Sequence, residues 1–189
     1  MIKLLPILVF AFILTACSDQ RLDDYSDVSF ELINQQGEAV QFPDDFEGAP
    51  LVVGFIYTQC PDICSFITAN VKQVYEEGVH PEGTRFVLVT FDPERDTPDV
   101  LARYAAAFEM DGEPFSFLTG NPDIISQMMR RVGVRSVITD ERTTETGQEI
   151  YFINHTDKIL LIDSRSRLVF DYGGSMTPVN IIAEDLQKL

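Results

Sequence analysis

The chain of 189 residues is 45% hydrophobic and 11% aromatic, which is typical of a globular protein and too apolar for a disordered one. Its formal net charge of −16 argues against nucleic-acid binding, because an acidic surface repels phosphates. The same charge repels anionic lipid, so any attachment to a membrane is expected to be covalent.

The first segment reads as a leader for export. Lys3 precedes an apolar run from Leu4 to Leu14, which is typical of a secretory signal and too short for a transmembrane helix of about 20 residues. The run ends in Thr15-Ala16-Cys17, which resembles the bacterial lipobox, where the leader is cut before a cysteine that receives lipid.

We therefore expect three parts: a lipoprotein signal peptide over residues 1–16, a lipidated Cys17 with a polar tether over 17–27, and one domain over 28–189. The protein would then be lipid-anchored in the bacterial cell envelope, on the extracytoplasmic side of a membrane. The alternative is an ordinary export signal with an incidental cysteine.

The first half of the domain predicts a hairpin, a buried strand and a helix. Val28–Ile33 and Glu38–Phe42 flank a turn and form the hairpin. Leu51–Tyr57 is a continuous apolar run, as in a central strand covered on both faces. A helix follows from about Pro61 to Glu77.

The second half predicts another buried strand, two helices, a polar loop between hairpin arms, a second hairpin and a last helix. In chain order these are Phe86–Thr90, Thr97–Phe108, Pro122–Arg131, Thr139–Gln148, Lys158–Asp163 with Arg167–Tyr172, and Pro178–Gln187. This order is typical of an α/β, thioredoxin-like fold, in which helices flank a central mixed sheet. Here an N-terminal β-hairpin is added, the central strands are parallel, and the last hairpin is antiparallel at one side.

Cys60 and Cys64 lie where the first central strand gives way to a helix, and chemistry in α/β sheets gathers beyond strand carboxyl ends. A helix N-terminus also lowers the pKa of a thiol. Three interpretations compete. A structural disulfide would close a tiny loop and stabilise little. Redox enzymes of the thioredoxin type use two intervening residues, whereas this chain has three. Metal binding is therefore favoured.

The third ligand is sought among two histidines. His80 lies in a polar connection and is expected to be exposed, whereas His155 precedes the strand that opens the last hairpin. In the thioredoxin order that position faces the cysteine turn. Two thiolates and one imidazole suit copper, because soft sulfur favours Cu(I) and nitrogen helps to hold Cu(II). Structural zinc would require a fourth protein ligand.

Four segments resemble the SCO/SenC family of copper-binding proteins: Gly54–Cys64, Val89–Pro98, Phe117–Gly120 and Asn154–Thr156. The resemblance covers about residues 28–183. It implies copper ligation by Cys60, Cys64 and His155, and the two thiols are expected to form a disulfide on oxidation. It further implies that the protein is a metallochaperone rather than an enzyme. Its partner would be the copper-accepting subunit of a respiratory oxidase, and it would deliver copper to the CuA centre of cytochrome c oxidase. The alternative is a thiol–disulfide oxidoreductase that keeps the copper-site cysteines of a partner reduced.

Three positions qualify the resemblance. Asp92 lies near the metal or is a loop carboxylate, and the second interpretation is favoured. Ser65 stands where the family often has proline, and Asn154 stands where it often has aspartate. Since asparagine carries no charge, we expect copper affinity or redox preference to differ from members with aspartate.

The lipobox generates a direct test. The mature protein is expected to begin at Cys17, to carry lipid and to partition with membranes, whereas Cys17→Ser releases the protein or leaves the leader uncut. Intact-mass analysis of the membrane fraction checks this, and an unmodified Cys17 would contradict it.

Overall fold

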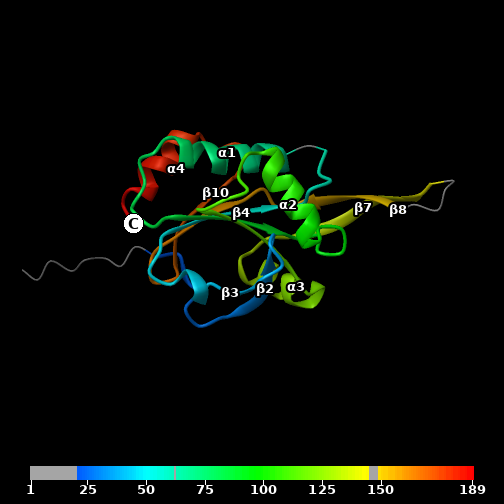
Figure 1. The fold of residues 1–189 in the computed structure, drawn as a ribbon, viewed down its shortest axis with the longest axis horizontal. Helices are drawn as coiled ribbons and strands as arrows, with labels where there is room; N and C mark the ends of the chain where they lie inside the picture. The colour runs from blue at the N-terminus through cyan, green and yellow to red at the C-terminus, as the bar shows by residue number, and fades with distance from the viewer. Residues whose placement is uncertain (1–20, 62, 145–148) are drawn as a thin grey trace, which may run out of the picture.

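An eight-stranded mixed sheet forms the centre of the protein, seen in a computed structural model that describes residues 21–61, 63–144 and 149–189 (Figure 1). The strand order is β1-β10-β9-β4-β5-β6-β2-β3. The parallel centre consists of β4 (Leu51–Ile56), β5 (Arg85–Thr90) and β6 (Phe115–Gly120). All six residues of β4 are buried, which confirms the central strand predicted from its apolar run.

Antiparallel strands extend this centre on both sides. On one side β9 (Ile159–Ile162) pairs with β4, and β10 (Arg167–Tyr172) pairs with β9, which confirms the predicted last hairpin. On the other side the predicted N-terminal hairpin, β2 (Phe30–Asn34) and β3 (Ala39–Phe42), joins the sheet through β6. β6 is a further strand that was not predicted from the sequence.

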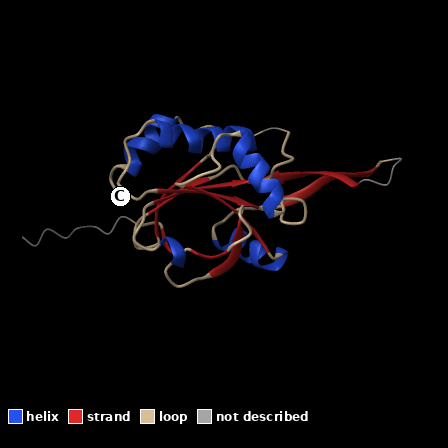
Figure 2. Ribbon diagram, viewed as in Figure 1, coloured by secondary structure: helices blue, strands red, loops and turns tan. Residues whose placement is uncertain are grey.

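Helices cover both faces of the sheet (Figure 2). One face carries α1 (Cys64–Glu76), α2 (Pro98–Ala107) and α4 (Val179–Leu186), and the other carries α3 (Pro122–Arg131) and the short 3-10 helix η1 (Asp44–Phe46). The four predicted helices are confirmed. However, α1 begins at Cys64 rather than at Pro61.

A separate two-stranded sheet projects from the body of the protein (Figure 1). It consists of β7 (Ser136–Thr143) and β8 (Glu149–His155), with Ser136 opposite His155 at its base. A hairpin was predicted here, and β7 and β8 form it. Its loop was predicted to begin at Thr139, which is wrong, since β7 continues to Thr143. The cause is that most β7 side chains are exposed, so the strand carries no apolar pattern. Residues 145–148 lie outside the described residues.

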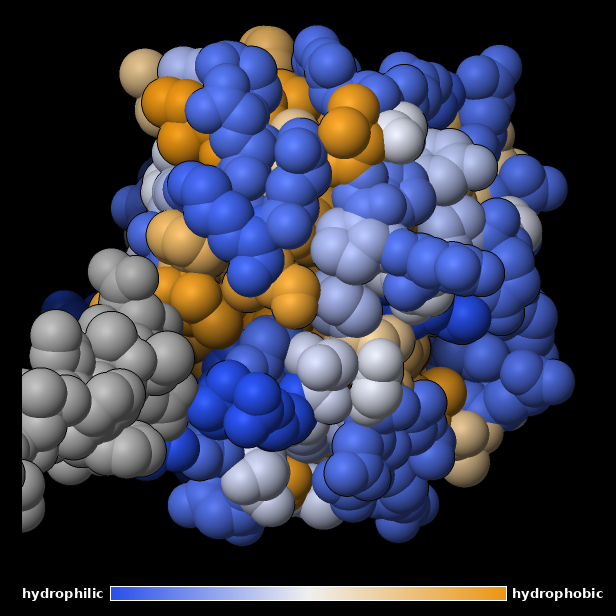
Figure 3. All heavy atoms as spheres, turned by 90° about the vertical axis from the view of Figure 1, so that its left-hand side faces the viewer, coloured by the Kyte–Doolittle hydropathy of each residue, from blue (hydrophilic) through white to orange (hydrophobic). Residues whose placement is uncertain are grey.

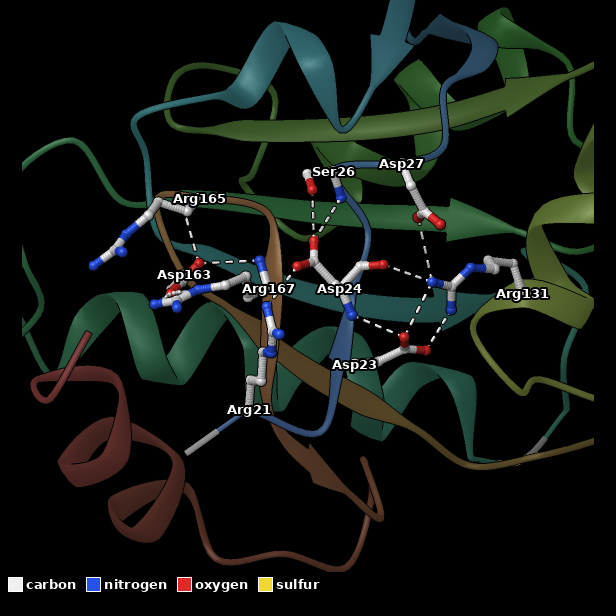
Figure 4. Close-up of polar contacts among 9 residues, drawn as sticks. All are labelled: Arg21, Asp23, Asp24, Ser26, Asp27, Arg131, Asp163, Arg165 and Arg167. Carbon is white, nitrogen blue, oxygen red and sulfur yellow. Dashed lines mark hydrogen bonds and ion pairs between the residues drawn. The ribbon is translucent and has the colours of Figure 1, made fainter. Parts of the chain in front are cut away.

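The N-terminal segment packs on the domain from residue 21 onward, so the predicted tether over 17–27 is wrong for residues 21–27. The short strand β1 (Asp23–Asp24) pairs with Leu168 and Arg167 of β10, and the side chain of Tyr25 is only 2% exposed. Arg131 binds the carboxylate of Asp23 and the carbonyl oxygen of Asp24 (Figure 4). Its guanidinium also lies 4.7 Å from the centre of the Tyr25 ring. Cys17 itself lies outside the described residues.

This segment marks one end of the sheet. β1 pairs with the start of β10, which lies beside the end of β9 and the start of β4. The face at this end is mostly hydrophilic, with smaller apolar patches (Figure 3). The cysteine turn follows the opposite end of β4. Within the described residues, no helix is long and apolar enough to cross a membrane.

Asp163 closes the turn between β9 and β10. Its Oδ1 accepts hydrogen bonds from the backbone N–H groups of Arg165 and Arg167, at 2.9 and 3.0 Å, and its Oδ2 accepts from the Arg167 guanidinium. Burial raises the pKa of this carboxyl, but the bonds from Arg167 and the backbone outweigh burial and hold the pKa below its usual value. The ionised form therefore stabilises the fold.

We predict that Asp163→Asn lowers the free energy of unfolding at pH 7 by about 1–3 kcal/mol, because the amide loses the charged bonds to Arg167. The folded pKa is depressed, so the wild-type advantage is full above the unfolded pKa of about 3.9 and disappears as pH falls through the folded pKa. Urea unfolding at pH 7 and at successively lower pH measures it. The exposed Asp111→Asn is the control, and a difference that does not change with pH would contradict the assignment.

Candidate metal centre

The turn after β4 is fixed to the end of β5 by one buried carboxylate. The backbone N–H and the hydroxyl of Thr58 donate to Asp96 at 3.0 and 2.5 Å, and the Thr90 hydroxyl donates at 2.6 Å. Asp96 is fully buried, and this burial raises its pKa in spite of the hydrogen bonds. The cysteine turn thus starts from a position that the central sheet determines.

Cys60 lies outside the helix, and Cys64 is its first residue. The backbone N–H of Cys64 points at Cys60 Sγ, 3.5 Å away, so the first sulfur lies over the N-terminus of α1. Cys64 is 1% exposed, whereas Cys60 is half-buried. The expectation that the helix lowers thiol pKa values is wrong for Cys64, because its hydrogen bond to Cys60 and its burial raise the pKa of this thiol.

His155 ends β8 and lies between two aromatic rings, with ring centres 4.5 Å from Phe91 and 6.0 Å from Tyr57. Its Nε2 is 3.3 Å from Cys64 Sγ, and its Nδ1 is 3.0 Å from the carbonyl oxygen of Thr156. A carbonyl oxygen only accepts, so Nδ1 carries the proton and the lone pair of the neutral ring lies on Nε2, facing the sulfurs. Burial lowers the pKa of His155, but its hydrogen bonds to Cys60 and Thr156 raise the pKa by more.

The ligand atoms of Cys60, Cys64 and His155 all lie within 4.8 Å of one another. Metal–sulfur bonds of about 2.3 Å and metal–nitrogen bonds of about 2.0 Å allow separations of up to about 4.6 Å around one ion. The three side chains therefore need little movement to share an ion. Two sulfurs and one imidazole form a soft donor set that suits copper.

A cavity of about 190 Å3 opens beside the ligands, lined by Cys60 and His155 together with Pro61, Ile63 and Phe152. Asn154 also lines it and is exposed. Of the two sulfurs, Cys60 lines this cavity, while Cys64 lies buried behind it. An incoming molecule would therefore meet Cys60 first.

The other candidate residues have contacts of their own. His80 is half-buried rather than exposed, because its ring stacks on Tyr75 and meets the edge of Phe86. Asp92 is 4% exposed and pairs with Arg95 and Tyr151, as expected of a loop carboxylate. Sequence reasoning missed Arg95 and Asp96, although both lie in the Val89–Pro98 segment that carried the resemblance.

The family model and two related sequences that match this chain belong to SCO proteins. A model of the SCO1/SenC family matches residues 18–189. An SCO2-like protein of Rickettsia prowazekii is 31% identical over 140 residues, which cover 73% of this chain and 64% of that relative. An SCO1 protein homolog of Bacillus subtilis is 25% identical, and the match covers 96% of this chain and 92% of the relative. The chain thus spans slightly less than two thirds of the Rickettsia protein.

Solved structures agree with these relatives. A SCO1/SenC family lipoprotein from Bacillus anthracis is 26% identical with a TM-score of 0.71, and the match covers 90% of this chain and 98% of that one. ScoI of Bradyrhizobium japonicum with copper bound is 26% identical with a TM-score of 0.67, covering 85% and 97%. These matches confirm the predicted thioredoxin-like fold class.

The thiol geometry predicts a redox-dependent affinity. On oxidation Cys60 and Cys64 are expected to form an intramolecular disulfide, and the oxidised protein is expected to bind copper weakly, because no thiolate remains. Thiol trapping and copper titration before and after reduction measure both effects, and Cys64→Ser serves as a control that cannot form the bond. Equal copper affinity in the two states would show that the sulfurs are not ligands.

Proposed function

Because the chain belongs to the SCO1/SenC family, we propose that it is a metallochaperone that binds one copper ion through Cys60, Cys64 and His155. The acceptor in this proposal is the CuA centre of cytochrome c oxidase. The observation that carries the proposal is the meeting of two cysteine sulfurs and one imidazole nitrogen within 4.8 Å. The copper-bound relative from Bradyrhizobium japonicum supports it.

The site is suited to both holding and releasing the ion. The Thr156 carbonyl fixes the tautomer of His155, so Nε2 needs no rearrangement to bind. The cavity beside Cys60 gives ligands of an acceptor protein access to one sulfur. Transfer by stepwise exchange of ligands between the two proteins is consistent with this half-open arrangement.

The second candidate is a thiol–disulfide oxidoreductase, and the contrast between the two cysteines favours it. Cys60 lines the cavity, and Cys64 is buried next to it. The Cys60 thiolate would attack a partner disulfide and form a mixed disulfide. Cys64 would then displace the partner as a dithiol, leaving a Cys60–Cys64 disulfide. This reaction does not require His155.

Lipid attachment at Cys17 would place the protein in the bacterial cell envelope, facing the extracytoplasmic side. The lipobox supports this location, as does the related lipoprotein from Bacillus anthracis. Because β1 holds the N-terminal segment at the end of the sheet opposite the cysteine turn, the copper site would face away from the membrane. The acceptor would then offer its copper-binding residues on an extracytoplasmic domain.

His155 separates the two functions. We predict that His155→Ala weakens Cu(II) binding by more than about 100-fold, since loss of a ligand should exceed the 10–100-fold cost typical of residues around the ligands. The Cys60–Cys64 disulfide is expected to form and to be reduced as in the wild type. Copper titration and thiol trapping of the reduced protein provide the two measurements.

The biological measurement is oxidase assembly at low copper in cells that lack the protein. His155→Ala is expected to fail to restore assembly, whereas His80→Ala, which changes the other histidine, is expected to restore it. If His155→Ala restores assembly as well as wild type at equal expression, copper delivery is not the function, and the oxidoreductase takes its place.

A further inference from the structure

The loop after β5 contains an arginine that contacts both halves of the metal centre. The Arg95 guanidinium donates from Nε to Asp92 Oδ2 at 2.5 Å and from Nη1 to the carbonyl oxygen of Tyr151 at 3.0 Å. The same Nη1 lies 3.4 Å from Oε1 of Gln59, the residue before Cys60. One side chain thus joins the cysteine turn to strand β8.

Tyr151 completes this contact from the side of β8. The Arg95 guanidinium lies over its ring, 3.5 Å from the ring centre, and its hydroxyl donates to Asp92 Oδ1 at 2.8 Å. Asp92 and Tyr151 are 4% and 9% exposed. The hydrogen bonds to Asp92 and the cation–π contact with the Tyr151 ring are therefore shielded from water. Charged hydrogen bonds and cation–π contacts are strongest in such shielded positions.

The β7–β8 hairpin depends on such side chains for its position. Among the described residues, β8 pairs with β7 and with no strand of the main sheet. On the edge of β8 nearest the cysteine turn, Arg95 binds the carbonyl oxygen of Tyr151, and the N–H of Ile153 donates to the hydroxyl of Tyr57 at 3.2 Å. His155 follows two residues later on the same strand.

We propose that Arg95, held by Asp92 and stacked on Tyr151, is a positioning residue that keeps His155 in reach of Cys60 and Cys64. The proposal rests on the copper site of the proposed function and assigns a role to the Asp92–Arg95 segment. The two cysteines belong to one turn and one helix start, so their mutual distance does not depend on Arg95. Binding that uses all three ligands therefore depends on Arg95 more than binding that uses the sulfurs alone.

The test uses reduced full-length protein carrying Arg95→Gln or Arg95→Lys. Both variants are expected to weaken Cu(II) binding by about 10–100-fold, the usual effect of changing a residue that orients a ligand. They are also expected to alter the Cu(II) spectrum and to leave Cu(I) affinity nearly unchanged. Lysine keeps the positive charge but lacks the planar guanidinium, which stacks on the Tyr151 ring and donates hydrogen bonds from two nitrogens. Arg95→Lys is therefore not expected to rescue binding.

A measurement without copper accompanies the titration. Backbone amides of β8 are expected to exchange hydrogen faster in Arg95→Gln than in wild type, while amides of β4 exchange at the same rate. The matched control is Arg85→Gln. Arg85 pairs with Glu113 at the opposite end of β5 and, like Arg95, has a buried guanidinium nitrogen without a hydrogen-bond partner. This control is expected to change neither copper binding nor exchange in β8.

The outcomes separate this proposal from the proposed function. Wild-type Cu(II) binding by Arg95→Gln, together with loss of binding in His155→Ala, would overturn the positioning role and leave the copper site intact. If wild type itself does not bind copper, unchanged exchange of the β8 amides in Arg95→Gln overturns the positioning role separately. If Arg95→Gln fails to fold, Asp92→Asn decides. It removes the charged acceptor that holds the Arg95 guanidinium, and binding and exchange equal to wild type in that variant would overturn the proposal.

Discussion

The metal centre depends on the antiparallel pairing of β9 with β4. This pairing places Ile159 opposite Gly54, near the carboxyl end of β4, so that His155, four residues earlier, enters beside the cysteine turn. Cys64 and His155 are 91 residues apart, and bringing the ends of a loop of that length together costs conformational entropy. Folding of the sheet has already offset this cost before a metal binds. Gly54 contributes by its size, because a Cβ there would lie 3.1 Å from Ile67 of α1, the helix that begins with Cys64.

The parts of the fold that the sequence predicted are those with strong local signals. β4 was predictable from its apolar run, and α2 and α3 from proline at their first positions. β1 could not be predicted, since two aspartates become a strand only through β10 and through Arg131. The part of β7 from Thr139 to Thr143 was assigned to the loop of a hairpin, because its side chains are mostly exposed and do not alternate between buried and exposed positions.

Residue type and position predicted that Cys60, Cys64 and His155 would lie together, but they did not predict the environment of these side chains. The sequence predicted a helix that begins at about Pro61, directly after Cys60, whereas α1 begins at Cys64 and leaves Cys60 four residues before the helix. This difference makes one sulfur buried and the other accessible. It also reverses the expected pKa shift of Cys64, because the effect of a nearby sulfur and of burial exceeds that of the helix N-terminus. Such balances depend on side-chain packing, which spacing alone does not encode.

The two halves of the centre differ in how firmly the fold holds them. The cysteine turn is bound to the main sheet through Asp96, whereas His155 belongs to a two-stranded sheet attached through side chains such as Tyr57 and Arg95. A soft Cu(I) ion is well served by sulfur, while Cu(II) gains from the imidazole. A thiol pair with a separately held histidine would therefore allow one chain the two proposed modes of action. With the hairpin in place the site would bind a metal with three ligands, and without the histidine the same sulfurs would retain thiol–disulfide chemistry. The two proposed functions thus share the cysteines and differ in their need for the β7–β8 hairpin.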